Sequence, residues 1–92
     1  MKVKLGNNVW ELKHVDLGPK VRGEIDPPSY ENKALKISKR LRKNQELLEV
    51  ILHECLHGCF WAADEDIIDK AAADISKVLY TLGARIDTKK MP

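Results

Sequence analysis

The first half of the chain alternates apolar and polar residues, which is the period of a β-strand with one buried face. The clearest segment is 8–15 (NVWELKHV), and shorter segments at 20–25 and 33–41 repeat the pattern. Two prolines in segment 26–33 predict a loop, because proline cannot donate a backbone hydrogen bond within a sheet. We therefore predict a three-stranded sheet over residues 8–41, antiparallel or mixed.

The second half of the chain changes to a helical period. Apolar residues recur every three or four positions and predict a helix over 45–62, with Asn44 as its N-cap. A second helix is predicted over 65–82, capped by Asp64 and ended by Gly83. Strands followed by two packed helices define an α+β fold.

The length of 92 residues predicts a single domain over 1–92, in which residues 84–92 form a loosely ordered tail. No apolar segment is long enough to span a bilayer, and the N-terminus lacks the apolar core of a signal peptide. Cys55 and Cys59 lie four positions apart on one predicted helix, which is a poor geometry for a disulfide. We expect free thiols and a cytoplasmic location.

The formal net charge is only +2, and the basic residues concentrate in segment 36–43 (KISKRLRK). A nucleic-acid-binding surface is one interpretation of this cluster. No aromatic residue interleaves with it, so a platform for stacking single-stranded bases is not indicated. A solvated strand end explains the cluster more simply, and the sequence disfavours a nucleic-acid partner.

Two of the three histidines, His53 and His57, flank Glu54 in the sequence HECLH. At about 100° per residue, residues four apart lie within about 40° of each other on a helix. Both imidazoles therefore project from one face, where their nitrogens can reach one zinc ion at about 2.0–2.1 Å. Glu54 lies on the flank of that face, where it can act as a general base on water.

A catalytic zinc ion takes three protein ligands, so a third is expected from the second helix. The candidates are Asp64, Glu65, Asp66 and Asp69. Helix capping and the helix dipole account for the first three. Asp69 lies inside the helix and about as far beyond the predicted chain reversal as the histidines lie before it. We predict Asp69 as the third ligand, with Glu65 as the alternative. Asp74 or another carboxylate could then orient a ligand imidazole.

Other features of the sequence help to decide between a metal site and a chance occurrence of the motif. The helical wheel places Cys55 and Cys59 away from the histidines, so we interpret them as small buried apolar residues rather than ligands. His-Glu-x-x-His also occurs in helices that bind nothing, where carboxylates satisfy the histidines. An acidic helix after the motif, a separate apolar face and an alternating strand before it favour the metal site.

With HECLH on a helix between alternating strands and an acidic helix, the chain resembles the zincin metallopeptidases. With a carboxylate as third ligand it is similar to the gluzincin branch and to compact ImmA/IrrE-type and SprT-like domains. Short phage and bacterial proteins share Asp26-Pro27-Pro28 before the last strand and a tryptophan after the motif, here Trp61. The third histidine of the metzincins is absent, and Ala63 occupies its position.

The resemblance implies zinc-dependent hydrolysis of a peptide or protein substrate. Glu54 would take a proton from a zinc-activated water that attacks the peptide carbonyl, and would pass it to the leaving amine. An extended substrate would pair with an edge strand at 34–38. Trp10 is expected in the core, and Trp61 could wall the site. Candidates for stabilising the oxyanion are Tyr30, His14, Tyr80 and Arg85.

Two other functions are compatible with the same sequence. A zinc ion could stabilise a domain that binds a protein partner without catalysis. A mildly basic nucleic-acid-associated factor would use segment 36–43. Glu54 would provide a base beside an open metal position. A structural zinc site needs no such base, so Glu54 favours the hydrolase.

Overall fold

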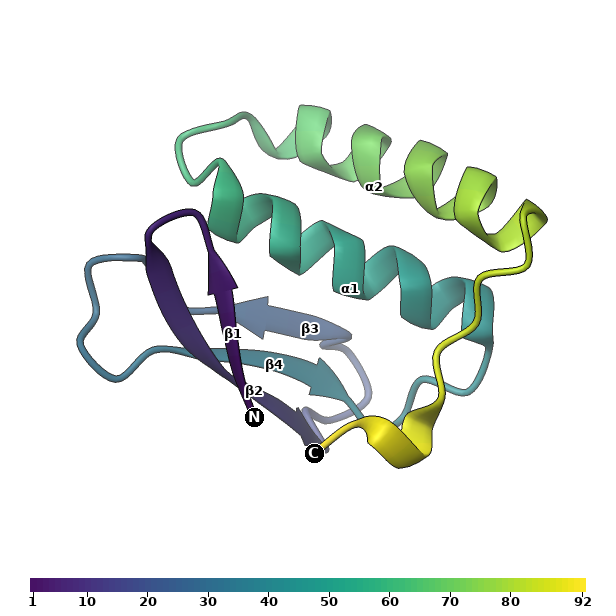
Figure 1. Ribbon diagram of the computed structural model, residues 1–92, viewed down its shortest axis with the longest axis horizontal. Helices are drawn as coiled ribbons and strands as arrows, with labels where there is room; N and C mark the ends of the chain where they lie inside the picture. The colour runs from purple at the N-terminus through teal and green to yellow at the C-terminus, as the bar shows by residue number, and fades with distance from the viewer.

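The computed structural model describes residues 1–92 and has the predicted α+β architecture (Figure 1). A four-stranded sheet is followed by two helices that pack together. The elements in chain order are β1 (Lys2–Leu5), β2 (Asn8–Val15), β3 (Gly23–Ile25), β4 (Ala34–Ser38), α1 (Asn44–Cys59), α2 (Glu65–Thr81) and a 3-10 turn (Thr88–Lys90).

The strand order across the sheet is β1-β2-β4-β3, and the sheet is mixed. β1 pairs antiparallel with β2, β2 pairs parallel with β4, and β4 pairs antiparallel with β3. The prediction of three strands missed β1, a four-residue strand with two lysines that is completed only by a tight hairpin to β2. In the hairpin, Leu5 pairs with Asn8, and Gly6 has a positive φ of 62°.

β4 lies between β2 and β3, so the prediction that residues 34–38 form an edge strand is wrong. Its side chains show why: Leu35 and Ile37 are fully buried, and Ala34 and Ser38 on the other face are buried as well. Sequence order placed β4 last, but the chain returns from β2 to form β3 first and then inserts β4 between them. The edges of the sheet are β1 and β3.

Asp26, in the Asp-Pro-Pro turn, connects β3 to β4. Its carboxylate accepts a hydrogen bond from the Ala34 amide at 2.8 Å, and its carbonyl accepts one from the Trp10 indole at 3.0 Å. Trp10 is fully buried, as expected, in a core that it shares with residues of β4 and α1. The turn therefore fixes the start of β4 against the core.

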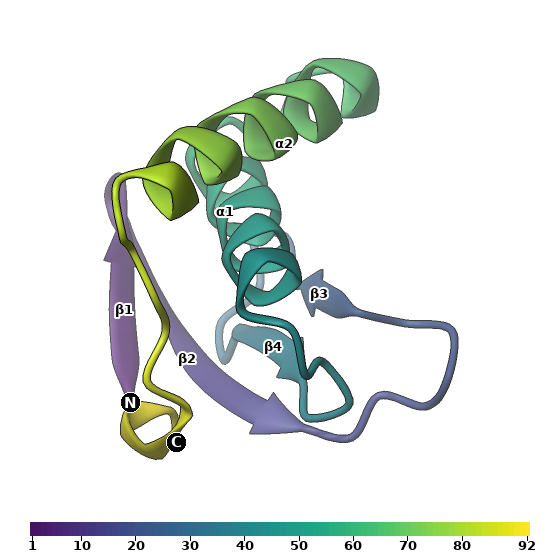
Figure 2. The same ribbon diagram turned by 90° about the vertical axis from the view of Figure 1, so that its right-hand side faces the viewer.

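The molecule has three layers, with the sheet on one side, α1 in the middle and α2 outside (Figures 1 and 2). α1 packs on the sheet, whereas α2 packs only on α1. Gly58 lets α1 approach the sheet closely, because a Cβ at this position would lie 2.6 Å from Leu5 Cδ1. Neither α-helix combines the length and the apolar character that a bilayer crossing requires.

The helix ends only partly follow the sequence. The Asp64 side chain caps α2 by accepting a hydrogen bond from the Asp66 amide, as predicted. The prediction of Asn44 as an N-cap is wrong, because the N-cap position is Lys43 and has no side-chain cap. Asn44 instead pairs with the backbone of Ile86: its Nδ2 donates to the Ile86 carbonyl (3.0 Å) and its Oδ1 accepts from the Ile86 amide (2.7 Å).

Segment 84–92, expected to be loosely ordered, leaves α2, passes the start of α1 and ends beside the sheet (Figure 1). Besides the tie to Asn44, Ile86 and Met91 pack against the hydrophobic core. A 3-10 turn lies between these two contacts, with the Asp87 side chain accepting from the Lys89 amide. The segment therefore closes the open end of the layer between α1 and the sheet.

Candidate metal centre

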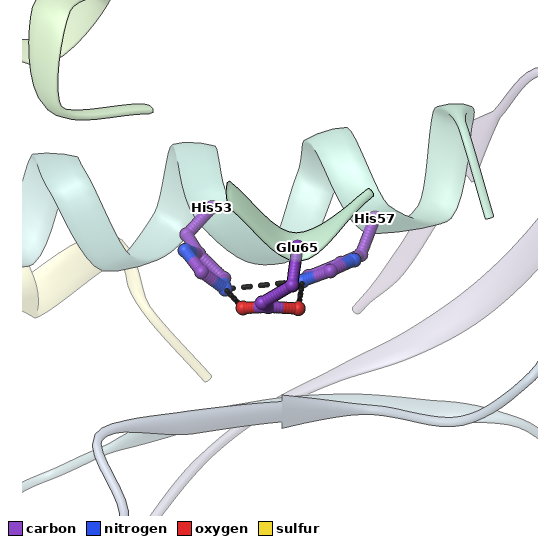
Figure 3. Close-up of side chains that lie close together, drawn as sticks. All are labelled: His53, His57 and Glu65. Atoms are coloured by element: carbon purple, nitrogen blue, oxygen red, sulfur yellow. Dashed lines mark hydrogen bonds and ion pairs between the residues drawn. The ribbon is translucent and has the colours of Figure 1, made fainter. Parts of the chain in front are cut away.

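Three side chains from the two helices converge beside the sheet (Figure 3). His53 and His57 project from one face of α1, and their Nε2 atoms lie 3.1 Å apart. Glu65, in the first turn of α2, places Oε1 3.1 Å from His53 Nε2 and Oε2 2.9 Å from His57 Nε2. One ligand atom from each of these residues lies within 4.8 Å of the others, so all three can reach one ion.

Asp69 lies on the opposite side of the His53 ring. Its Oδ1 lies 3.0 Å from His53 Nδ1, an ion-pair contact when the imidazole is protonated. A carboxylate beside the second ring nitrogen is the arrangement that orients metal-binding imidazoles in proteins. The structure therefore brings Glu65, the alternative in the sequence analysis, to the Nε2 atoms, and gives Asp69 an orienting position.

The chain-reversal argument explains why Asp69 was favoured. Asp69 does lie level with His53, because α1 ends at Cys59 and α2 begins at Glu65. However, the position of a residue along the helix axis does not determine which ring nitrogen its carboxylate reaches. Glu65 lies one turn closer to the reversal, and its longer side chain reaches both Nε2 atoms.

The three groups fit a zinc ion. Two imidazole nitrogens and one carboxylate are donors that zinc takes in catalytic sites. Ligands at about 2.0–2.1 Å in tetrahedral geometry lie about 3.3–3.4 Å from one another. The two Nε2 atoms lie 3.1 Å apart, close to that edge length, and each contacts a different oxygen of the Glu65 carboxylate, at 3.1 and 2.9 Å. Three protein side chains converge, which is the number of protein ligands that a catalytic zinc site takes.

Glu54 is buried on the sheet-facing side of α1, next to this cluster. The pKa of its carboxyl is raised from 4.5 to about 7, mainly by burial. The nearby carboxylates of Glu65 and Glu24 contribute to the rise, and His53 and Arg22 oppose it. A Cβ at Gly23 would lie 3.1 Å from Glu54 Oε2. The glycine on β3 therefore provides the space that Glu54 occupies.

A cavity of about 560 Å³ opens over the cluster. Its walls are formed by His53, Glu54 and His57 of α1, the loop between the helices, Glu65 of α2 and the β3 residues Gly23 and Ile25. Trp61 walls the cavity, as the sequence suggested, with its ring centroid 6.5 Å from that of His57. None of the four oxyanion candidates, Tyr30, His14, Tyr80 and Arg85, lines it.

Gly23 and Ile25 were missed in the sequence analysis. The signal for Gly23 was a glycine inside a strand pattern, which marks close approach of another group. The pairing shows how β3 presents its edge: the Arg22 carbonyl accepts from the Ser38 amide, and the Asp26 amide donates to the Ala34 carbonyl. Because the bonding direction alternates along an antiparallel strand, Gly23 and Ile25 point their backbone groups away from β4.

Three other sequence interpretations change with the structure. Asp74 forms an ion pair with Lys70 at 3.5 Å and contacts no imidazole, so its predicted orienting role is wrong. Cys55 is half-buried, and burial raises the pKa of its thiol to about 11, but Cys59 is exposed rather than buried. Both thiols are free and lie outside the cluster, as expected.

Comparison of the chain with protein-family models, with curated proteins and with solved structures gives no match in any of the three. The function of the site is therefore inferred from the arrangement of its side chains alone.

Proposed function

We propose that the protein is a small zinc-dependent hydrolase of the metallopeptidase type. The observation that carries this proposal is the convergence of His53 Nε2, His57 Nε2 and the Glu65 carboxylate beside a buried glutamate, Glu54, in one open cavity. His53, His57 and Glu65 would hold the ion. When bound, zinc would supply a Lewis acid that polarises a carbonyl and makes water a better nucleophile.

Glu54 is the general base in this proposal. A carboxyl with a pKa of about 7 is partly ionised near neutral pH, so it can take a proton from water and return it to a leaving amine. Its position on the wall that also carries both histidines supports this role. Asp69 acts as a positioning residue, because its carboxylate lies 3.0 Å from Nδ1 of the His53 ring.

The proposed substrate is an extended peptide, and β3 replaces residues 34–38 as the strand that pairs with it. β3 is an edge of the sheet, it lines the cavity, and the backbone groups of Gly23 and Ile25 are free of β4. A peptide that adds to this edge gains backbone hydrogen bonds without a sequence requirement. It would also run past Glu54, which abuts Gly23.

The observed charges support a peptide over a nucleic acid. In the basic segment 36–43, Lys36 pairs with Glu24 at 3.6 Å and Arg40 pairs with Asp16 at 2.7 Å. These acidic partners reduce the positive charge available for phosphates. The two free thiols, Cys55 and Cys59, support the cytoplasmic location expected from the sequence.

The test is hydrolysis of an unfolded protein by chains loaded with equal amounts of zinc, followed by mass spectrometry of the products. We expect cleavage by the wild type and loss of at least about 100-fold in Glu54→Gln, because general base catalysis contributes about 10²–10⁴-fold. Glu49→Gln, on the same helix but outside the cavity, is the matched control and should cleave like the wild type.

Two results would contradict the proposal. Persistent cleavage by Glu54→Gln would exclude the assigned base. A zinc-loaded wild type that cleaves no unfolded protein would instead favour the zinc-stabilised binding domain.

A further inference from the structure

The outer surface of α2 carries an apolar stripe that the fold leaves uncovered. Ile67 is 64% exposed, Ile75 42%, Val78 59% and Leu82, just after the helix, 78%. Single exposed apolar residues are ordinary on a protein surface. Four large ones on a single element of a 92-residue chain are a concentration that marks an interaction surface.

The positions of these residues on the helix show that they form one stripe. At about 100° per residue, Ile67, Ile75, Val78 and Leu82 fall within about 80° of arc, and the half-buried Ala71 falls among them. The residues of α2 buried against α1 are Ile68, Ala72 and Ser76, centred about 100° further around. α2 contacts no other element, so nothing in the fold covers the stripe.

The stripe is also separate from the candidate metal centre. Glu65 and Asp69 face α1 and the histidines, on the far side of the buried face from the stripe. In Figure 2, α2 is the outermost layer of the molecule, beyond α1 and away from the sheet. A partner can therefore cover the stripe without closing the cavity over the site.

The spacing of the stripe is self-complementary. Its positions are 67, 71, 75, 78 and 82, so the intervals of four, four, three and four residues read almost the same in both directions. We propose that two copies of the chain associate through this stripe, with their α2 helices antiparallel about a two-fold axis near Ile75. Ile67 of one copy then lies opposite Leu82 of the other, and Ala71 lies opposite Val78.

The charges beside the stripe fit the same arrangement. Antiparallel pairing keeps the acidic start of α2, with Asp64 and Asp66, away from the same residues of the second copy. Near the axis, Asp74 of one copy lies about two residues from the level of Lys77 of the other. This pair occurs twice because the interface is isologous. Parallel pairing would instead place the acidic ends together.

The size of the stripe sets the expected strength. α2 has 17 residues and is about 25 Å long, so the contact is smaller than a standard interface of about 800 Å² per partner. We therefore expect a reversible dimer with a dissociation constant in the micromolar range, rather than a permanent one. This association does not depend on zinc or on the proposed hydrolase activity.

Sedimentation velocity of the full chain across the micromolar range tests the dimer. We expect a concentration-dependent dimer for the wild type, and at least about tenfold weaker association for Ile75→Glu and for Val78→Glu. Val9→Glu is the matched control: Val9 is 45% exposed but lies on β2, so it should associate like the wild type. A monomer at every concentration, or full dimerisation of both stripe variants, would overturn the proposal.

Cross-linking tests the antiparallel direction. In a Cys55→Ser, Cys59→Ser background, Ile75→Cys should form a disulfide-linked dimer under mild oxidation, because the two copies meet at this residue. Ile67→Cys should not, because the two positions lie about 22 Å apart along antiparallel helices. Cross-linking of both variants would indicate parallel pairing and contradict the inference.

Discussion

The burial of Glu54 makes a quantitative prediction for the free energy of unfolding of the metal-free chain. Its pKa is about 7 in the folded protein, against an ordinary value of 4.5. At about 1.36 kcal/mol per pKa unit, this difference corresponds to about 3 kcal/mol. Glu54→Gln keeps the size of the side chain and removes the titration, so the pair of proteins isolates this contribution.

The direction of the effect follows from proton binding. Between about pH 4.5 and pH 7 the folded protein holds a proton on Glu54 that the unfolded chain has released. The free energy of unfolding of the wild type therefore falls as the pH rises through this interval. Above about pH 7, Glu54 no longer changes the free energy of unfolding with pH. Relative to Glu54→Gln, the wild type should lose about 3 kcal/mol across the interval.

The assay is urea unfolding with a chelator present, followed by tryptophan fluorescence, because Trp10 is fully buried in the folded core. Glu49→Gln is the control for removing one carboxylate from α1. A difference between wild type and Glu54→Gln that changes by less than about 1 kcal/mol between pH 4.5 and pH 8 would refute the assignment of a buried, desolvated carboxyl.

Three further variants test the packing around the site. Gly23→Ala places a Cβ against Glu54, so it should cost about 1–3 kcal/mol in urea unfolding and reduce turnover at unchanged zinc content. Gly58→Ala drives a methyl group into the sheet and should cost about 1–3 kcal/mol, whereas an unhindered helical glycine would gain about 1 kcal/mol from alanine. Asn44→Ala should raise amide exchange of Ile86 and the residues after it, measured by hydrogen–deuterium exchange.

The fold class and both helices could be predicted from the sequence, because their signals are local. Each signal lies within a few residues of the element that it predicts: the helical period of apolar residues, the Asp64 cap and the glycine after α2. The order of strands in the sheet is not local. Nothing in segment 34–38 says that β3 will return on its outer side, and only the tertiary structure shows that β4 is buried on both faces.

The candidate site shows the same division. His53, Glu54 and His57 were found from one motif, because residues four apart on a helix share a face whatever surrounds it. The roles of Glu65 and Asp69 depend on which ring nitrogen each carboxylate reaches, which the packing of α2 on α1 decides. Asn44 was predicted as a cap and instead binds residue 86, a partner 42 positions away that no local pattern indicates.

The most direct test of the account is zinc binding by the purified chain, measured as metal content and as affinity in competition with a chromogenic chelator. We predict about one zinc ion per wild-type chain, loss of binding in His53→Ala and Glu65→Ala, and affinity about 10–100-fold weaker in Asp69→Ala, which removes the carboxylate that contacts His53 Nδ1. A wild type that takes up no zinc, or a Glu65→Ala variant that binds it as tightly as the wild type, would contradict the proposed metal centre.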